Sequence, residues 1–83
     1  MISKRVTVNK ETGVDMPLAA EISKKAVQFK SHISICTEDG SANAKSLLSV
    51  LGSGLEAGAK LEIRCDGVDE NKAITAICQI LEK

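Results

Sequence analysis

The sequence has almost no aromatic residues, a single proline and no excess of charge of either sign. Phe29 is the only aromatic residue among the 83, so the chain lacks a platform of rings on which the bases of a nucleic acid could stack. Eleven Lys and Arg residues balance eleven Asp and Glu residues, whereas nucleic-acid-binding proteins normally carry a basic excess that neutralises phosphates. These absences argue against a nucleic acid as a partner.

Long hydrophobic runs and paired cysteines are also missing. No stretch approaches the ~20 consecutive apolar residues needed to span a bilayer, and the first eight residues lack the apolar segment of a signal peptide. Cys36, Cys65 and Cys78 are odd in number and widely spaced, which fits neither a disulfide framework nor paired zinc ligands. We therefore expect free thiols in a cytoplasmic protein without membrane insertion, and neither a metal nor a cofactor.

Hydrophobic periodicity predicts seven elements within one domain of residues 1–83. Alternation of apolar and polar residues indicates strands at 2–8, 32–37, 42–43 and 61–66. Apolar residues at helical spacing indicate helices at 17–29, 46–51 and 69–83. The order is β-α-β-β-α-β-α, and the short turn at 38–40 allows only an antiparallel hairpin. We expect an α+β domain in which a four-stranded antiparallel sheet is covered on one face by three helices.

The expected helix starts are marked by residues that satisfy free backbone amides. Ser46 precedes the short apolar run and is a natural N-cap. Pro17 suits the first turn of its helix because its missing N–H costs nothing there, with Asp15 or Met16 capping from outside. Asp69 is expected to cap the last helix.

Side chains that carry enzymatic chemistry are scarce. His32 is the only histidine, so no imidazole pair exists, and its position at a strand start predicts a solvated surface residue. Cys65 and Cys78 share the spacing of core residues, whereas Cys36 has the opposite strand parity and is the one thiol expected to react. These features indicate a small binding or carrier protein rather than an enzyme.

Several short motifs then occur in a specific order. They are Thr12-Gly13, Asn43-Ala44-Lys45-Ser46-Leu47, Gly54-Leu55 with Gly58, Asp66-Gly67 with Asp69-Glu70, and Lys72-Ala73. In this order and spacing, the chain resembles HPr, the small phosphocarrier of the bacterial sugar phosphotransferase system. The resemblance covers nearly the whole chain. It implies the open-faced β-sandwich of that family, with the same β-α-β-β-α-β-α order.

The chain departs from the family where the family has its phosphorylated histidine. HPr proteins carry Gly-Leu-His-Ala-Arg-Pro at the start of the first helix, and that histidine accepts phosphate from enzyme I. By the resemblance, Asp15 stands at the histidine position, Pro17 at the arginine position and Leu18 at the proline position. An ionised Asp repels an incoming phosphate dianion, and the guanidinium that would offset this repulsion is missing. We therefore expect that histidine phosphotransfer has been lost.

Ser46 corresponds to a second family site. In some bacteria the equivalent serine of HPr is phosphorylated by HPr kinase/phosphorylase, and the product binds a transcription regulator. One HPr homologue also lacks the histidine and keeps only this serine. The resemblance therefore implies a regulatory or interaction domain with Ser46 as a candidate phosphorylation site and with Met16, Leu47, Leu48 and Leu51 as partner-binding residues.

Two alternatives remain open on the sequence. In the first, Asp15 accepts phosphate as an acyl phosphate, and the chain is still a phosphocarrier. In the second, only the fold is kept, as a structural or oligomerisation module. The expected partners are proteins of the phosphotransferase system, or HPr kinase and a transcription regulator, and the oligomeric state is open.

Overall fold

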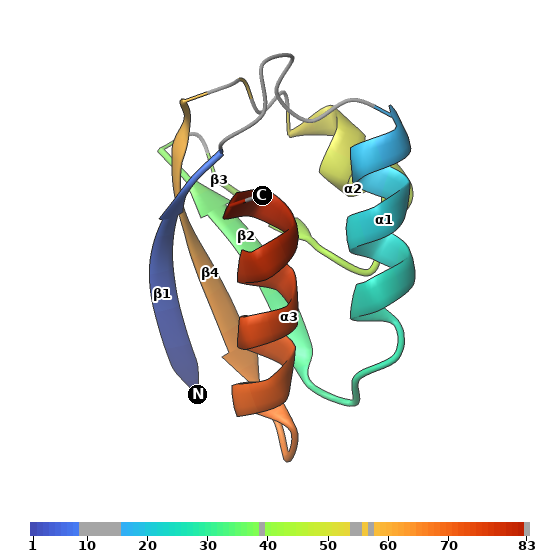
Figure 1. The fold of residues 1–83 in the computed structure, drawn as a ribbon, viewed down its shortest axis with the longest axis vertical. Coiled ribbons are helices and arrows are strands. Elements are labelled where there is room, and N and C mark those ends of the chain that lie inside the picture. The colour runs from blue at the N-terminus through green and yellow to red at the C-terminus, as the bar shows by residue number, and fades with distance from the viewer. Residues whose placement is uncertain (9–15, 39, 54–55, 57, 83) are drawn as a thin grey trace.

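A computed structural model describes residues 1–8, 16–38, 40–53, 56 and 58–82 (Figure 1). Its elements are β1 (Ile2–Thr7), α1 (Met16–Ala26), β2 (His32–Thr37), β3 (Gly40–Asn43), α2 (Leu47–Gly52), β4 (Lys60–Asp66) and α3 (Glu70–Glu82). The β-α-β-β-α-β-α order predicted from the sequence is confirmed. No helix among these residues combines the length and the apolar character that a membrane span requires.

The four strands form one sheet in the order β1-β4-β2-β3, and every neighbouring pair is antiparallel. Ile63 of β4 lies opposite Ile35 of β2 and Lys4 of β1. The three helices all lie on one side of this sheet (Figure 1). The structure thus confirms the α+β class and the open-faced arrangement.

The core lies between the sheet and the helices. Each central strand turns every second side chain toward the helices because successive residues of a strand point to opposite faces. The fully buried residues of largest volume include Ile22, Ile33, Ile35, Ile63, Ile77 and Leu81, which come from β2, β4, α1 and α3. Burying an aliphatic side chain of this size contributes roughly 1.5–3 kcal/mol relative to exposure. The other face of the sheet carries polar side chains.

Helix α1 differs at both ends from the sequence prediction. It begins at Met16, which is therefore its first residue and not a cap, and it ends at Ala26, three residues before the predicted end at Phe29. The Phe29 amide donates to the Ala26 carbonyl three residues back (3.1 Å), which is a tighter turn than an α-helix makes. Phe29 still packs partly buried against the core, which confirms its predicted apolar contact. Its predicted place within the helix is wrong.

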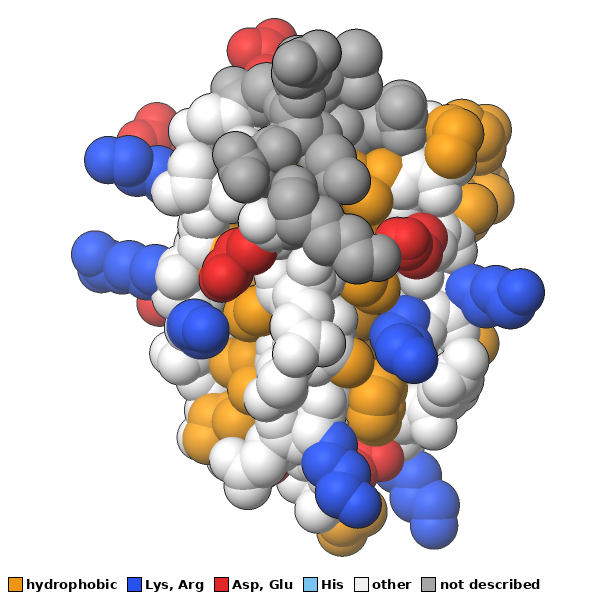
Figure 2. All heavy atoms as spheres, in the orientation of Figure 1, with side chains coloured by type: hydrophobic (Ala, Val, Ile, Leu, Met, Phe, Trp, Pro, Cys, Tyr) orange, Lys and Arg blue, Asp and Glu red, His pale blue; other side chains and the backbone are white. Residues whose placement is uncertain are grey.

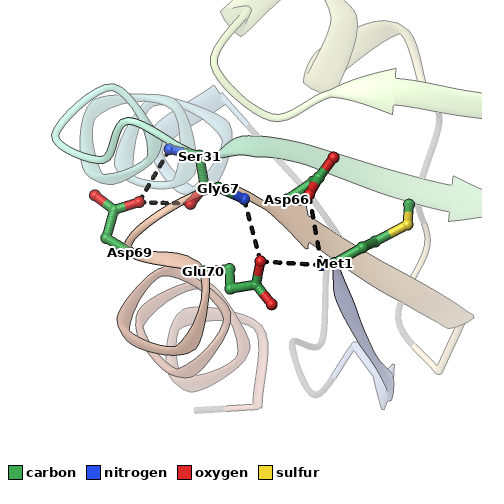
Figure 3. A network of polar contacts seen from close by, with 6 residues as sticks. All are labelled: Met1, Ser31, Asp66, Gly67, Asp69 and Glu70. Carbon is green, nitrogen blue, oxygen red and sulfur yellow. Dashed lines mark hydrogen bonds and ion pairs between the residues drawn. The ribbon is translucent and has the colours of Figure 1, made fainter.

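The carboxylate of Asp69 makes different contacts from those predicted. Its backbone carbonyl accepts from the Ala73 amide (3.0 Å), as an N-cap residue's does. The side chain instead accepts from the Lys30 amide (2.9 Å). It also accepts from the amide (3.0 Å) and the hydroxyl of Ser31 (Figure 3). Asp69 therefore holds the segment before β2 against the start of α3.

Glu70, the first residue of α3, binds the chain beside the nearby ends of two strands. Its Oε1 accepts from the Gly67 amide (3.2 Å) and from the ammonium of Met1 (3.0 Å), which also lies 3.5 Å from an Asp66 carboxylate oxygen (Figure 3). A carboxylate in the first turn of a helix is also favoured by the helix dipole. The ends of β1 and β4 are thus tied to the start of α3.

Candidate functional site

The start of α1 presents an apolar side chain to solvent. The helix buries Leu18, Ala19, Ile22 and Ala26 along one stripe, and this spacing leaves Met16 outside the stripe and 56% exposed. Asp15, the residue expected at the phosphohistidine position, lies outside the described residues.

Ser46 caps α2, as the sequence predicts. Its Oγ accepts from the Ser49 amide (3.3 Å), and its carbonyl accepts from the Val50 amide (3.0 Å). Its backbone is extended, with φ −104° and ψ 114°, as N-cap residues normally are. The hydroxyl oxygen thus acts as an acceptor within the helix, and the residue remains partly exposed.

Most of the apolar side chains of helix α2 are partly or largely exposed to solvent. Val50 is its one buried residue, while Leu47 and Leu51 are partly buried and Leu48 is 81% exposed. We call Met16, Leu47, Leu48 and Leu51 together the apolar surface. Helices α1 and α2 lie against each other, and Figure 2 shows hydrophobic side chains exposed beside the start of α1. The structure therefore places the four predicted partner-binding residues on adjoining helices.

Lys45 holds α2 against α1 rather than facing Ser46. Its Nζ donates to the Phe29 carbonyl (2.8 Å), which follows the end of α1, and its own carbonyl accepts from the Ser23 hydroxyl (3.2 Å). A cation at the C-terminal end of a helix is also favoured by the helix dipole. Sequence reasoning missed this role because Lys45 and Phe29 are 16 positions apart, and no local pattern links them.

His32 lies at the other end of the molecule from the start of α1 (Figure 1). It is the first residue of β2, is exposed, and lies in register with Asp66. Strand β2 begins at the end of the molecule where α1 finishes, opposite to the end where α1 starts (Figure 1). The prediction of a surface histidine is confirmed, and His32 does not join Met16 at the start of α1 (Figure 1).

The three cysteines divide as the sequence predicts. Cys65 and Cys78 are buried, and burial raises the pKa of both thiols, that of Cys65 to about 11. Cys36 is partly exposed and lines an open groove of about 800 Å³ together with Arg5, Glu62 and others. All three are free thiols.

No cluster of three or more His, Cys, Asp or Glu side chains in the described ranges is arranged to bind a metal ion. Helices α1 and α2 together present the Ser46 hydroxyl, which caps α2, and the apolar surface. Such an arrangement is suited to contact with another protein.

Comparisons with known proteins agree with this geometry. The family model "PTS HPr component phosphorylation site" matches residues 2–83. The chain is 33% identical over 81 residues to the phosphocarrier protein HPr of Lysinibacillus sphaericus, covering 98% of this chain and 92% of that protein. It is 30% identical over 83 residues to the HPr-like protein Crh of Halalkalibacterium halodurans, covering 100% of this chain and 99% of that one.

Solved structures show the same likeness in three dimensions. The crystal structure of HPr-C-His from Thermoanaerobacter tengcongensis superposes with a TM-score of 0.93 at 27% identity, covering 99% of this chain and 92% of that one. The Mycoplasma histidine-containing phosphocarrier protein superposes with a TM-score of 0.90 at 28% identity, covering 95% and 90%. The chain therefore belongs to the HPr family, whose members are phosphocarrier proteins and not enzymes.

Proposed function

We propose that this chain is an HPr-family regulatory or interaction domain that no longer carries phosphate on histidine. The observation that carries the proposal is the position of its only histidine. His32 begins β2, at the opposite end of the molecule from the start of α1, where the family resemblance locates the phosphorylated histidine (Figure 1). Phosphotransfer through an imidazole requires that group to meet enzyme I and the sugar-specific proteins at one surface.

The apolar surface supports a role in binding other proteins. Leu48 is 81% exposed and Met16 is 56% exposed, and neither contributes to the core. Burying a side chain of this kind in a complex contributes roughly 1.5–3 kcal/mol. Because both side chains are already solvent-exposed, a partner can cover them without any change in the fold.

We extend the proposal to phosphorylation of Ser46 by an HPr kinase, followed by binding to a transcription regulator. The hydroxyl is partly exposed at the start of α2, beside Leu47 and Leu48. A phosphate would add a charge of about −1.5 to −2 next to the apolar surface. The Lys45 ammonium is already bonded to the Phe29 carbonyl, so the partner supplies the cations that recognise this charge. The proposed setting is one cytoplasmic domain of residues 1–83.

Intact-mass measurement of phosphorylation tests this proposal. The protein is mixed separately with phosphoenolpyruvate and enzyme I, and with HPr kinase and ATP, with an ordinary HPr as positive control. We expect no gain with enzyme I and a gain of ~80 Da, one phosphoryl group, with the kinase. Ser46→Ala should abolish this gain, whereas the matched variant Ser53→Ala, at the other end of α2, should keep it.

The opposite results separate the alternatives. A hydroxylamine-labile gain with enzyme I that Asp15→Ala removes would contradict the proposal and identify an acyl-phosphate carrier. No gain in either mixture would refute phosphorylation of Ser46.

The interaction role is tested separately, because Leu48→Ser should weaken capture of a phosphotransferase-system protein or of the transcription regulator while leaving the melting temperature nearly unchanged. Failure of the unsubstituted protein to bind any of them would favour the structural module.

A further inference from the structure

Strand β3 forms one edge of the sheet and has β2 as its only neighbouring strand. The Ala44 amide donates to the Ile33 carbonyl (2.9 Å) just beyond the end of β3. In an antiparallel pair, residues that bond across the pair alternate with residues whose backbone groups point away. By this alternation Ala42 bonds to β2, while Ser41 and Asn43 direct their backbone N–H and C=O groups outward.

Three of these outward backbone groups have no partner among the described residues. They are the N–H and C=O of Ser41 and the N–H of Asn43, since the Asn43 carbonyl already accepts from the Ser46 amide (3.0 Å). Exposed edges are commonly protected against pairing by charged residues or proline. The opposite edge, β1, carries Lys4 and Arg5, whereas β3 consists only of Gly, Ser, Ala and Asn.

A groove of about 370 Å³ runs along this edge. Its lining includes Ile35, Ser41, Ala42, Ser49, Gly52 and Ser53. Because Ile35, Thr37 and Ala42 lie on the helix-covered face, the groove lies between that face and α2, and Ser41 brings it to the free edge of β3. Helix α2 supplies the other wall, and a Cβ added at Gly52 meets no atom within 4 Å. The space beside the edge is therefore open.

We propose that β3 and α2 form a docking groove for an extended segment of a partner protein, which adds to the sheet as a fifth strand. In this mode of recognition, backbone hydrogen bonds provide affinity and a side-chain pocket provides selectivity. None of the described residues lining the groove is charged. A charged side chain there would lose its hydration without gaining a counter-ion, so the segment presents an uncharged aliphatic or hydroxylated side chain to the groove.

The groove uses a different part of α2 from the apolar surface. Ser49 and Gly52 line the groove, whereas Leu48 and Leu51 belong to the apolar surface. Successive residues of a helix are about 100° apart around its axis, so the two sets lie on adjacent faces. One partner segment in the groove therefore leaves Ser46 and Leu48 available to another protein.

Titration of the full-length ¹⁵N-labelled protein with short capped peptides tests the groove. The probe is a pool of pentapeptides with Val, Ile, Leu or Thr at alternate positions and Ser or Thr between them. We expect saturable shifts of the Ser41 and Asn43 amides and slower hydrogen exchange at both. The same pool with Glu or Lys at the alternate positions should bind at least about tenfold more weakly, the order of effect of leaving a buried charge unpaired.

Two variants and one modified probe make the result decisive. Gly52→Leu adds a side chain beside the groove, its Cβ meeting no atom within 4 Å, and should weaken binding about tenfold or more, while Gln79→Leu, an exposed substitution on α3, should leave it unchanged. Backbone N-methylation of the peptides should weaken binding strongly because it removes the hydrogen bond donated to the Ser41 carbonyl and puts a methyl group against the strand edge. Unshifted Ser41 and Asn43 amides across the pool would overturn the proposal, as would undiminished binding by folded Gly52→Leu.

Discussion

Asp69 joins two segments of the chain through three hydrogen bonds to residues 30 and 31. The bond from the Ser31 hydroxyl is the largest cause that lowers the carboxyl pKa from 3.8 to about 2, followed by the bond from the Lys30 amide. Hydrogen bonds donated to a carboxylate stabilise its charged form. Protonation of Asp69 is therefore harder in the folded protein than in the unfolded chain.

The lowered pKa of Asp69 determines how the stability of the folded protein changes with pH. Its contribution to the free energy of unfolding should be complete above pH 3.8, decrease as the pH falls, and be lost below about pH 2. Urea unfolding at several pH values measures this contribution as the difference between the wild type and Asp69→Asn. We expect the difference to shrink across this interval. The same series on Glu56→Gln controls for removing one acidic charge, and a difference that grows toward low pH would contradict the assignment.

Local sequence rules identified the residues at the starts of α2 and α3 more reliably than the contacts of their side chains. Ser46 was predicted as an N-cap and is one, because capping involves residues only three positions apart. Asp69 was also placed correctly at a helix start, but its carboxylate bonds to residues that are 38 and 39 positions away in sequence. Only the folded chain brings those amides within reach.

Among the elements, the connection between β4 and α3 depends on a close approach at Gly67. A Cβ at this position would lie 2.6 Å from both the Cα and the Oγ of Ser31. Ser31 is fully buried and bonded to Asp69, so it cannot move away without breaking that contact. The missing side chain of Gly67 is therefore what lets β4 and α3 pack against the segment before β2.

We expect Gly67→Ala to destabilise the protein by about 1–3 kcal/mol, the usual cost of inserting a methyl group into a packed site. Gly52→Ala is the matched control, because a Cβ at Gly52 meets no atom within 4 Å. In a helix this control should be neutral or stabilising by up to about 1 kcal/mol. Urea unfolding monitored by circular dichroism compares the two variants with the wild type. Equal stability of Gly67→Ala and Gly52→Ala would show that the contact with Ser31 relaxes freely.

At the scale of the whole molecule, the reactivity of the cysteines measures how readily the core opens to solvent. Cys65 and Cys78 are almost completely buried, at 0% and 2% exposure, whereas Cys36 lies in an open groove. Burial also raises the pKa of Cys65 to about 11, which lowers the fraction of reactive thiolate. Reaction of the two buried thiols therefore requires opening of the core.

We expect a thiol reagent to label one cysteine quickly and two slowly in the native protein. Cys36→Ser should remove the fast phase, and urea below the unfolding transition should accelerate only the slow phases. Mass spectrometry of the labelled peptides identifies which thiol has reacted at each time. Labelling of Cys65 as fast as Cys36 would contradict the buried position of Cys65.

The sequence by itself determined the seven elements, their order, the α+β class and most of the core. Alternation along β4 and helical spacing along α3 are local consequences of backbone geometry, so Ile63, Cys65 and Ile77 were placed inside without knowledge of the fold. The expectation of a protein-binding site also came from the sequence, through the motifs around Ser46 and the resemblance that they carry.

Only the tertiary structure decided the strand order β1-β4-β2-β3, the early end of α1 and the contacts of Lys45 and Asp69. Each depends on residues that are distant in sequence, and hydrophobic patterning shows which face of a segment is buried but not which segment covers it. The groove beside β3 has the same origin, because it exists only where an edge strand and α2 meet. Pairing between segments that are distant in sequence arises only in the folded chain, and no local sequence pattern specifies it.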